Sequence, residues 1–313
     1  MIRYAKPSIH HDDLTALDIQ TESCDIGPGK KVEEFEWALQ ERLGAKHVTV
    51  VDSCTSALYL SFRTLKSSRV TLPIMTYAAV PQAALSAGKE DIVFVDHDAP
   101  ADVTLLYGGE PPKEPLGKIV DAAHAFPHYT KGPIWCYSFG PIKNLTCGQG
   151  GAIATDNSAV AERVREWRNL GMKDGQVWAK GCLRHTMPDI NAALGLAQLE
   201  RFNEMQTRRW EIASIYNERL RVRKPEPTPG HSWHLYVVHV PRRDHVRETL
   251  RAAGIETQVH YPLLTDSPAF WDFPRAEHPN ATAWSRSCLS LPMHPDLSDD
   301  DVNLVCDTLE KAL

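Results

Sequence analysis

The chain has 313 residues, more than one hydrophobic core usually holds, so two domains are expected. Its apolar content of 42% and charged content of 24% are ordinary for a globular protein, and a net charge of −6 without a basic patch disfavours a nucleic-acid partner. No apolar run reaches the roughly 18 residues that span a membrane, the first residues lack a secretory pattern, and seven cysteines without CxxC spacing suit a reduced compartment, so we expect a cytoplasmic protein.

Short apolar runs alternate with helical patterns between residues 46 and 156. Seven runs are expected to be strands: 48–51, 70–72, 92–95, 103–107, 119–120, 134–139 and 152–154. Helices are expected at 31–43, 56–65 and 79–87. Most of the strand runs are continuously apolar, as in strands buried on both faces. This part of the chain therefore predicts an α/β domain with a mostly parallel, seven-stranded sheet.

The remaining sequence predicts two more helices and a small α+β domain. One helix is expected at 159–170 with Gly171 as its cap, and a long one runs from Asp189 towards Leu220 after Pro188. Beyond the turn-forming segment 225–230 we expect strands at 233–240 and 256–261, a helix at 244–253, an irregular stretch to Arg286 and a last helix capped by Ser298. We divide the chain into a large domain, 1–207, and a small domain, 208–313.

Lys143 lies in a short loop between an apolar run and the glycine-rich segment 148–151. Small neighbours let a backbone approach a ligand, and a lysine removed from water has a lowered pKa and a nucleophilic amine. An exposed loop lysine is the ordinary alternative. Asp121 ends a predicted strand, where a buried carboxylate needs a partner such as a pyridinium N–H or a structural arginine. A lysine and an acid of this kind are the minimal equipment of a pyridoxal-phosphate enzyme.

Three other places can contact a cofactor, and each has an ordinary alternative. Segment 53–58 follows a strand and opens a helix, so it is either a phosphate site or a simple N-cap. Tyr77 could cover a flat ring or lie in the core. His124 could contact a ring face or oxygen, or be a core histidine. No HExxH or close ligand spacing occurs among the histidines, so no metal site is predicted.

The ordered set of motifs resembles the DegT/DnrJ/EryC1/StrS family of sugar aminotransferases. The resemblance rests on these segments: Gly27–Glu36, Ser53–Leu58, Pro73–Tyr77, Asp121–His124, Ser138–Gly151, Met187–Tyr216, His260–Pro262 and Leu289–Pro292. It implies the aspartate-aminotransferase-like fold, which is fold type I of the pyridoxal-phosphate (PLP) enzymes. It also implies a PLP-dependent aminotransferase that moves an amino group, with glutamate as the expected donor, to a keto acceptor, first of all a nucleotide-linked keto-sugar.

The resemblance also implies roles for single residues. Lys143 would form the internal aldimine with PLP and then move protons, and Asp121 would keep the pyridine nitrogen protonated. His124 would contact the ring oxygen, and Tyr77 would stack on the ring. The phosphate would be bound by Cys54, Thr55 and Ser138. The family's active site takes a residue from a second subunit, which implies a homodimer, and Arg184 aligns with that residue. Candidates for the substrate pocket are Pro28, His234, Tyr236, His260 and Tyr261.

The chain also departs from the family pattern. Cys54 stands where glycine or alanine is usual, and Gln149 stands where the family has an acid. The 24 residues 97–120 leave little room for the family's two helices and contain four prolines, so we expect an extended connection and a thinly covered sheet face. Segment 127–134 is short as well. Alternatives are a PLP-dependent dehydratase or lyase, an aminotransferase with a non-sugar acceptor such as a modified base, a non-catalytic homologue and a metal enzyme.

Overall fold

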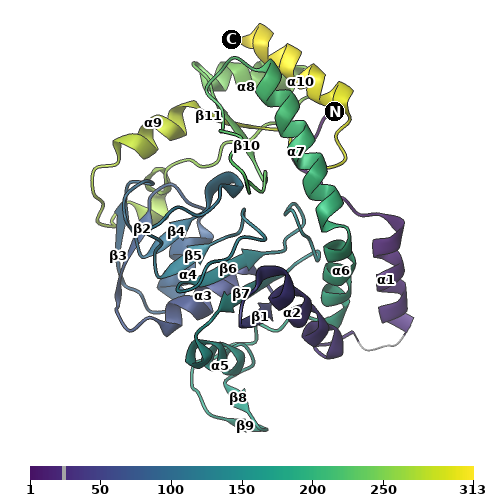
Figure 1. Ribbon diagram of the computed structural model, residues 1–313. Helices are drawn as coiled ribbons and strands as arrows, with labels where there is room; N and C mark the ends of the chain where they lie inside the picture. The colour runs from purple at the N-terminus through teal and green to yellow at the C-terminus, as the bar shows by residue number, and fades with distance from the viewer. Residues whose placement is uncertain (23–25) are drawn as a thin grey trace.

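The computed structural model describes residues 1–22 and 26–313, so Cys24 lies outside the described residues. A mixed five-stranded sheet with helices on both faces forms its centre (Figure 1). The strand order is β1-β7-β6-β5-β4. The strands are β1 (His47–Val51), β4 (Val103–Leu105), β5 (Ile119–Asp121), β6 (Ile134–Ser138) and β7 (Gly151–Thr155). β4, β5 and β6 are parallel, whereas β7 is antiparallel to both β1 and β6.

All seven predicted strands are present, but they do not form one continuous ladder. β2 (Arg69–Pro73) and β3 (Asp91–Val95) make a separate parallel pair. β2 lies beside the short strand β4, where the backbone N–H of Asp102 donates to Thr71 O at 3.1 Å. The Asp102 carboxylate accepts the N–H of Thr71 at 2.9 Å, so a side chain takes the place of a ladder carbonyl there. The expected mostly parallel sheet is therefore mixed and interrupted.

Helices cover the two faces of the sheet because successive strand residues alternate between two cores. Ile119 belongs to one core and Val120 to the other. One face packs against α3 (Cys54–Thr64), α4 (Ala79–Ser86) and α5 (Ser158–Trp167), and the other against α2 (Lys30–Leu43) and α6 (Asp189–Glu200). α5 ends at Trp167, three residues before the end of the predicted helix 159–170.

The sequence does not predict α1 (His11–Glu22), which packs beside α6 (Figure 1). Buried polar contacts, rather than an apolar stripe, hold it there. Asp13 is fully buried and accepts hydrogen bonds from Arg201 Nη1 at 2.6 Å and Gln198 Nε2 at 2.9 Å. A helix attached in this way lacks the periodic signal from which helices are predicted.

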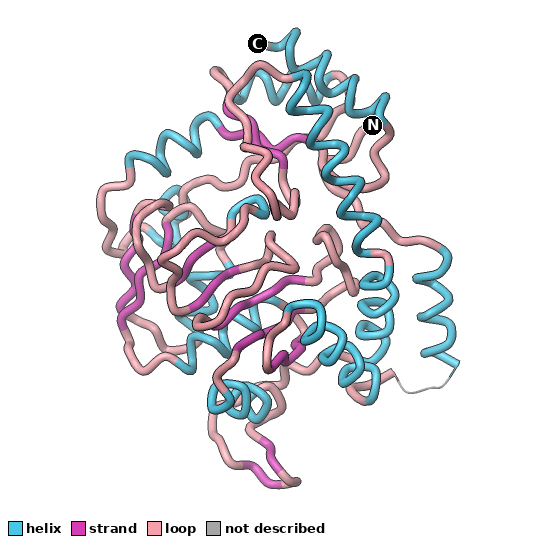
Figure 2. Tube along the Cα trace, in the orientation of Figure 1, coloured by secondary structure: helices cyan, strands magenta, loops and turns pink. Residues whose placement is uncertain are grey.

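The predicted long helix is two consecutive helices, α6 and α7 (Phe202–Arg219), separated by Arg201. α7 leads from the large core, which contains Phe202, to the small core, which contains Ile212 (Figures 1 and 2). The division of the chain at residue 207 stays a prediction. The first residues contact the small core, where Ile2 pairs with Ile255.

The small domain holds a two-stranded antiparallel sheet between helices. Its elements are β10 (Tyr236–His239), α8 (Arg243–Ala252), α9 (Pro279–Ser287), β11 (Cys288–Leu291) and α10 (Asp299–Ala312). The expected strand 256–261 is wrong: this segment makes only a single bridge, Gln258 to Ser290, while β11 takes the place beside β10. The predicted cap of the last helix is confirmed, since Ser298 and Asp301 form a capping box.

Two segments leave the body of the fold. The hairpin β8 (Met172–Lys173) and β9 (Gln176–Val177) projects below α5 (Figures 1 and 2) and exposes Val177 and Trp178. Segment 97–120 holds, apart from β4 and the start of β5, the short 3₁₀ turn η1 (Tyr107–Gly109), bends and irregular backbone, and its prolines agree with the lack of a longer helix. Within the described ranges, no helix is long and apolar enough to cross a bilayer.

Candidate active site

A pocket of about 380 Å³ opens where the parallel strands β4, β5 and β6 end. Leu105, Asp121 and Ser138, the last residue of each strand, all line it. The carboxyl ends of parallel strands are where open α/β sheets bind ligands. Ten of the predicted site residues line this pocket: Cys54, Thr55, Tyr77, Asp121, His124, Ser138, Lys143, His234, His260 and Tyr261.

Lys143 enters this pocket from the loop between β6 and β7. The loop is closed by backbone hydrogen bonds from Phe139 N to Gly150 O at 2.9 Å and from Cys147 N to Phe139 O at 3.0 Å. Asn191 on α6 donates from Nδ2 to Cys147 O at 2.8 Å and so ties the loop to the large domain. A lysine in a loop with this many constraints has a fixed position from which to react.

The Lys143 amine is largely removed from water. Burial lowers the pKa of Lys143 from 10.5 to about 8, although Cys54 and Asp121 favour the charged form. Nζ lies 3.4 Å from Nε2 of His234, a side chain that the sequence places in the substrate pocket. A substantial fraction of this amine is therefore neutral and nucleophilic near physiological pH.

Asp121 is 4% exposed and faces the same pocket. Burial raises the pKa of its carboxyl, while the N–H of Ala123, which donates to Oδ1 at 3.0 Å, and the charge of Lys143 lower it. Among the described residues, that N–H is the only hydrogen-bond donor to the carboxylate. A buried acid with one donor has capacity for a cationic ring N–H, and within residues 1–22 and 26–313 no arginine lines the pocket to act as the structural partner.

The start of α3 can hold an anion. Ser53 caps the helix, because its Oγ accepts the N–H of Ser56 at 3.2 Å, so the N-cap reading holds for this residue. The N–H groups of Cys54 and Thr55 have no acceptor among the described residues, and both residues line the pocket. Two free N–H groups at the positive end of a helix fit a phosphate.

Gly151 allows β7 to pass close behind this helix start. A Cβ at position 151 would lie 2.5 Å from the backbone carbon of Ser53 and 2.6 Å from the nitrogen of Cys54. Both atoms belong to the backbone, so no side chain could move aside. Position 151 must therefore be a glycine, because any side chain there would collide with the segment that we expect to bind the phosphate.

His124 is buried and lines the pocket. The N–H of Gly108 donates to its Nδ1 at 3.3 Å, so the proton of the neutral ring lies on Nε2, which is 3.0 Å from the hydroxyl of Tyr261. Burial and the nearby Lys143 hold the pKa of His124 well below its usual range. Tyr77 is 62% exposed at the rim, with its ring 6.1 Å from that of Tyr261.

Three predicted site residues do not line the pocket of a single chain. Tyr236 is fully buried in the small core, where its hydroxyl donates to Asn217 Oδ1 at 2.9 Å. Pro28 is exposed in the turn before α2. Arg184 is exposed and pairs with Asn169.

Sequence reasoning did not select three residues that contribute to the site. Asn144 follows Lys143 directly and holds His234, so its position beside the lysine was an available signal. Gln149 lines the pocket too, whereas the sequence marks it only as a departure from the family's acid at this position. Tyr4 reaches the pocket from the N-terminal segment and places its hydroxyl 3.4 Å from His260 Nε2. No local sequence pattern predicts this long-range contact.

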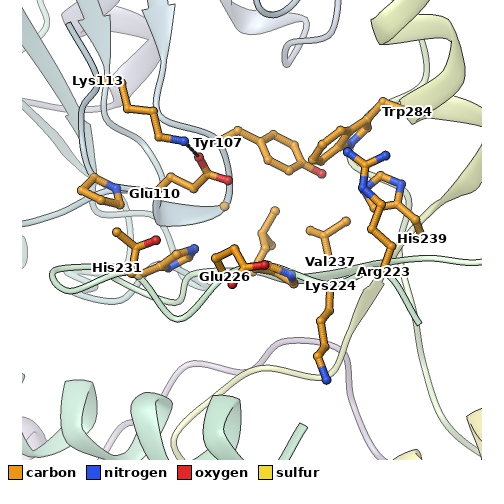
Figure 3. Close-up of a pocket in the computed structure, with 15 residues that line it drawn as sticks. Tyr107, Glu110, Lys113, Arg223, Lys224, Glu226, His231, Val237, His239 and Trp284 are labelled. Carbon is orange, nitrogen blue, oxygen red and sulfur yellow. Dashed lines mark hydrogen bonds and ion pairs between the residues drawn. The ribbon is translucent and has the colours of Figure 1, made fainter. Parts of the chain in front are cut away.

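A second cavity of about 410 Å³ lies between segment 107–113 and β10 (Figure 3). Tyr107, Lys113, Arg223 and Trp284 are among its lining residues. Lys113 is paired with Glu110 at 3.0 Å, and the Arg223 guanidinium lies 5.9 Å from the centre of the Trp284 ring. Three cationic residues line this cavity in the described part of the chain, namely Lys113, Arg223 and Lys224, and Lys113 is exposed.

Asp96, His97 and Asp98 are close enough to be considered as metal ligands, with one ligand atom each within 4.8 Å of the others. The Asp96 carboxylate, however, accepts the N–H groups of Asn280 at 2.9 Å and Ala281 at 2.7 Å. These are free donors of the first turn of α9. We therefore interpret Asp96 as a cap of that helix.

The comparisons agree with this geometry. The model of the DegT/DnrJ/EryC1/StrS aminotransferase family matches residues 7–104 and 115–310. The chain belongs to this family. The match omits residues 105–114, which begin next to η1 and lie within the segment expected to depart from the family.

Solved structures share the fold over nearly the whole chain. PseC of Helicobacter pylori, an aminotransferase in pseudoaminic acid biosynthesis, has a TM-score of 0.90 and 23% identity over 99% of this chain and 98% of its own. TlmJ, an aminotransferase from Streptoalloteichus hindustanus, has a TM-score of 0.90 and 27% identity over 100% and 98%. The PLP form of Spr1654 from Streptococcus pneumoniae has a TM-score of 0.88 and 22% identity over 99% of both chains.

These findings confirm the predicted family, fold type I and the aminotransferase class. The family depends on PLP, and Spr1654 is also known in a pyridoxamine-phosphate form. The residues of the pocket fit that cofactor: a desolvated lysine, a buried acid with free acceptor capacity and two free N–H groups for a phosphate lie around one cavity.

Proposed function

We propose that the protein is a PLP-dependent aminotransferase whose cofactor is bound covalently through Lys143. The observation that carries this proposal is the pairing of a desolvated lysine with a buried acid in one pocket at the strand ends. When bound, PLP supplies an electron-withdrawing ring that stabilises negative charge on the carbon that loses its proton. The chain's own residues bind, orient and move protons around that ring.

Lys143 has two tasks in this proposal. Its neutral amine would hold PLP covalently, with release of water, and the freed amine would carry a proton from the substrate carbon to a second carbon. The lowered pKa of about 8 suits both tasks, because the amine must carry and lose a proton near neutral pH. The hydrogen bonds that close the loop restrict the positions that the Lys143 amine can take relative to the reacting carbon.

Asp121 holds a proton on the ring nitrogen. Its burial makes a charge-assisted hydrogen bond to a ring N–H favourable, because the alternative is an unpaired carboxylate in a site with little water. Cys54, Thr55 and Ser138 bind the phosphate, the first two through their free N–H groups. His124 would contact the ring oxygen and Tyr77 would cover the ring, since both side chains line the pocket.

The substrates follow from the family and from the pocket. We expect glutamate as the amino donor and a nucleotide-linked keto-sugar as the acceptor, with His234, His260 and Tyr261 at the substrate side of the pocket. The name of PseC supports a sugar-derived acceptor by analogy. A non-sugar acceptor is the second candidate, because the family match omits residues 105–114 near the site. A cytoplasmic location remains a prediction from the sequence.

We also propose a homodimer in which the partner completes each site. The hairpin β8–β9 projects from the body and exposes apolar side chains, among them Val177 and Trp178, which are 68% and 67% exposed. Leu183, beside Arg184, is 60% exposed. An exposed apolar stretch of this kind supports an interface, and it would bring the Arg184 guanidinium towards the partner's phosphate site.

The direct test of this function is spectroscopic. Protein mixed with PLP should develop the absorbance of a lysine-bound cofactor, and glutamate should convert that absorbance to the pyridoxamine form. Lys143→Ala should lose both changes and lower transamination at least about a thousandfold. An unchanged spectrum in Lys143→Ala would refute the assignment, while loss of a keto-sugar's oxygen without consumption of glutamate would favour a dehydratase.

A further inference from the structure

His234 belongs to a buried hydrogen-bond chain that starts at the reactive amine. Its Nε2 lies 3.4 Å from Lys143 Nζ, and its Nδ1 lies 3.1 Å from Asn144 Oδ1. Asn144 Nδ2 donates to Ser232 O at 2.5 Å and to Gln206 Oε1 at 3.3 Å. His234, Asn144 and Ser232 are 4%, 7% and 2% exposed, so bulk water cannot replace these partners.

The carbonyl group at the far end of this series of hydrogen bonds determines which atom donates in each of them. The carbonyl oxygen of Ser232 only accepts, so the facing atom of Asn144 is its NH₂ group and the Asn144 oxygen points to His234. That oxygen requires a proton on Nδ1 of His234. The neutral ring then has a lone pair on Nε2, and this lone pair faces the lysine amine.

We propose that His234, held in this tautomer by Asn144, is a positioning residue that keeps the free amine of Lys143 in its reactive place. The assignment rests on the proposed function and sharpens it, because the sequence places His234 only in the substrate pocket. Lys143 is free before it captures the cofactor and again in the half-reaction that follows release. At those stages an unheld, flexible side chain would leave the line of attack.

The electrostatic surroundings keep His234 neutral, so towards Lys143 it acts as an acceptor. Burial holds the pKa of His234 well below its usual range, and Lys143, His124, Arg209 and His260 all disfavour its charged form. The lysine is faced by Cys54 and Asp121, which favour its charged form. A neutral acceptor stabilises an ammonium more than an amine, so His234 also keeps the pKa of Lys143 from falling further.

The first experiment measures the amine without turnover. Protein free of cofactor is mixed with PLP on both sides of pH 8, and the rate of covalent capture is followed by absorbance. The rate should rise with pH and level off near the pKa of Lys143. His234→Leu should move that midpoint down by about one pH unit and slow capture above it about tenfold. His234→Gln, whose Oε1 can replace Nε2 as acceptor, should restore most of the midpoint.

The matched control is His231→Leu, which removes a buried histidine from the same loop. His231 is 3% exposed, stacks on Trp233 and accepts the N–H of that residue at 3.0 Å. Its loss should lower stability but leave the capture midpoint unchanged. An unmoved midpoint in His234→Leu, or equal shifts in both variants, would overturn the assignment. If the wild type captures no PLP, the proposed function fails instead.

A second measurement needs no cofactor. Nitrogen-15 spectra of histidine-labelled protein should show a proton on Nδ1 of His234 and none on Nε2, with the signals identified by their absence in His234→Gln. In Asn144→Leu the proton should redistribute towards Nε2. A proton found on Nε2 in the wild type would contradict the positioning role, whatever the cofactor does.

Discussion

Two cavities of similar size, about 380 and 410 Å³, lie near each other, and both contain lysines. In the second cavity Lys113 is 78% exposed at its side chain and paired with Glu110, and Lys224 Nζ donates to Asn217 O and Leu220 O at 2.6 Å each (Figure 3). In the first, burial lowers the pKa of Lys143 to about 8, and the charge of the buried Asp121 acts on the same amine. The number of cationic side chains around a cavity therefore does not predict which cavity is the active site. Desolvation at the ends of parallel strands makes the difference.

Among variants that keep Lys143, the largest change should follow from removing the acid. Asp121→Asn keeps the shape of the side chain but cannot hold a proton on the ring nitrogen, so the rate of transamination should fall about a hundredfold or more. The matched control is Asp102→Asn, which removes a carboxylate that accepts the N–H of Thr71 outside the pocket. It should reduce stability and spare the rate. Similar rates for Asp121→Asn and the wild type would refute the role of Asp121.

The second prediction concerns the cost of burying the amine. The pKa of Lys143 is lowered to about 8 in the folded chain from 10.5, so its burial destabilises the fold fully below about pH 8, and this penalty disappears as the pH rises to 10.5. Lys143→Met should therefore raise the free energy of unfolding of cofactor-free protein at pH 7, by about 1–3 kcal/mol. Urea unfolding measures this. A less stable variant would show that the lysine is not desolvated.

A smaller effect is expected at Gly151. Gly151→Ala places a Cβ against the backbone of Ser53 and Cys54 and must displace the N–H groups that we assign to the phosphate. The affinity for PLP should fall about tenfold, since one or two charge-assisted hydrogen bonds weaken. Fluorescence titration measures the affinity, and thermal unfolding of the cofactor-free variant separates this loss from general damage. An unchanged affinity would place the phosphate elsewhere.

The smallest effect is expected in the second cavity. Lys113→Ala breaks an exposed ion pair with Glu110, and exposed pairs contribute little, so stability should change by less than about 0.5 kcal/mol. The transamination rate should stay within about twofold of the wild type. A large loss of rate would mean that the two cavities act together, and the contrast drawn above would need revision.

The sequence predicts the strands around the pocket, and the presence of Lys143 and Asp121 at it, because their signals are local. Two of the strands that end at the pocket, β5 and β6, come from short apolar runs. Asp121 directly follows the run 119–120, and Lys143 lies in the loop just after the run 134–139. The predicted family, fold type and class of enzyme follow from the same motifs. Topology then brings these strand ends together, which the alternation of strands and helices already indicates.

The features that the sequence does not predict depend on distant partners. β11 is a four-residue strand whose register is set by β10, more than forty residues earlier, and α1 is held by buried polar contacts. Tyr4 reaches the pocket only because the N-terminal segment pairs with the small domain. Tyr236 is expected in the pocket, yet its side chain points into the small core, because alternation along β10 decides its face.

The most direct test of the central claim locates the cofactor on the chain. Protein incubated with PLP is reduced with borohydride, digested and analysed by peptide mass spectrometry, which identifies the modified lysine. We predict one pyridoxyl group, on the peptide that contains Lys143. Modification of Lys113 or Lys224 instead, with Lys143 unlabelled, would contradict the account.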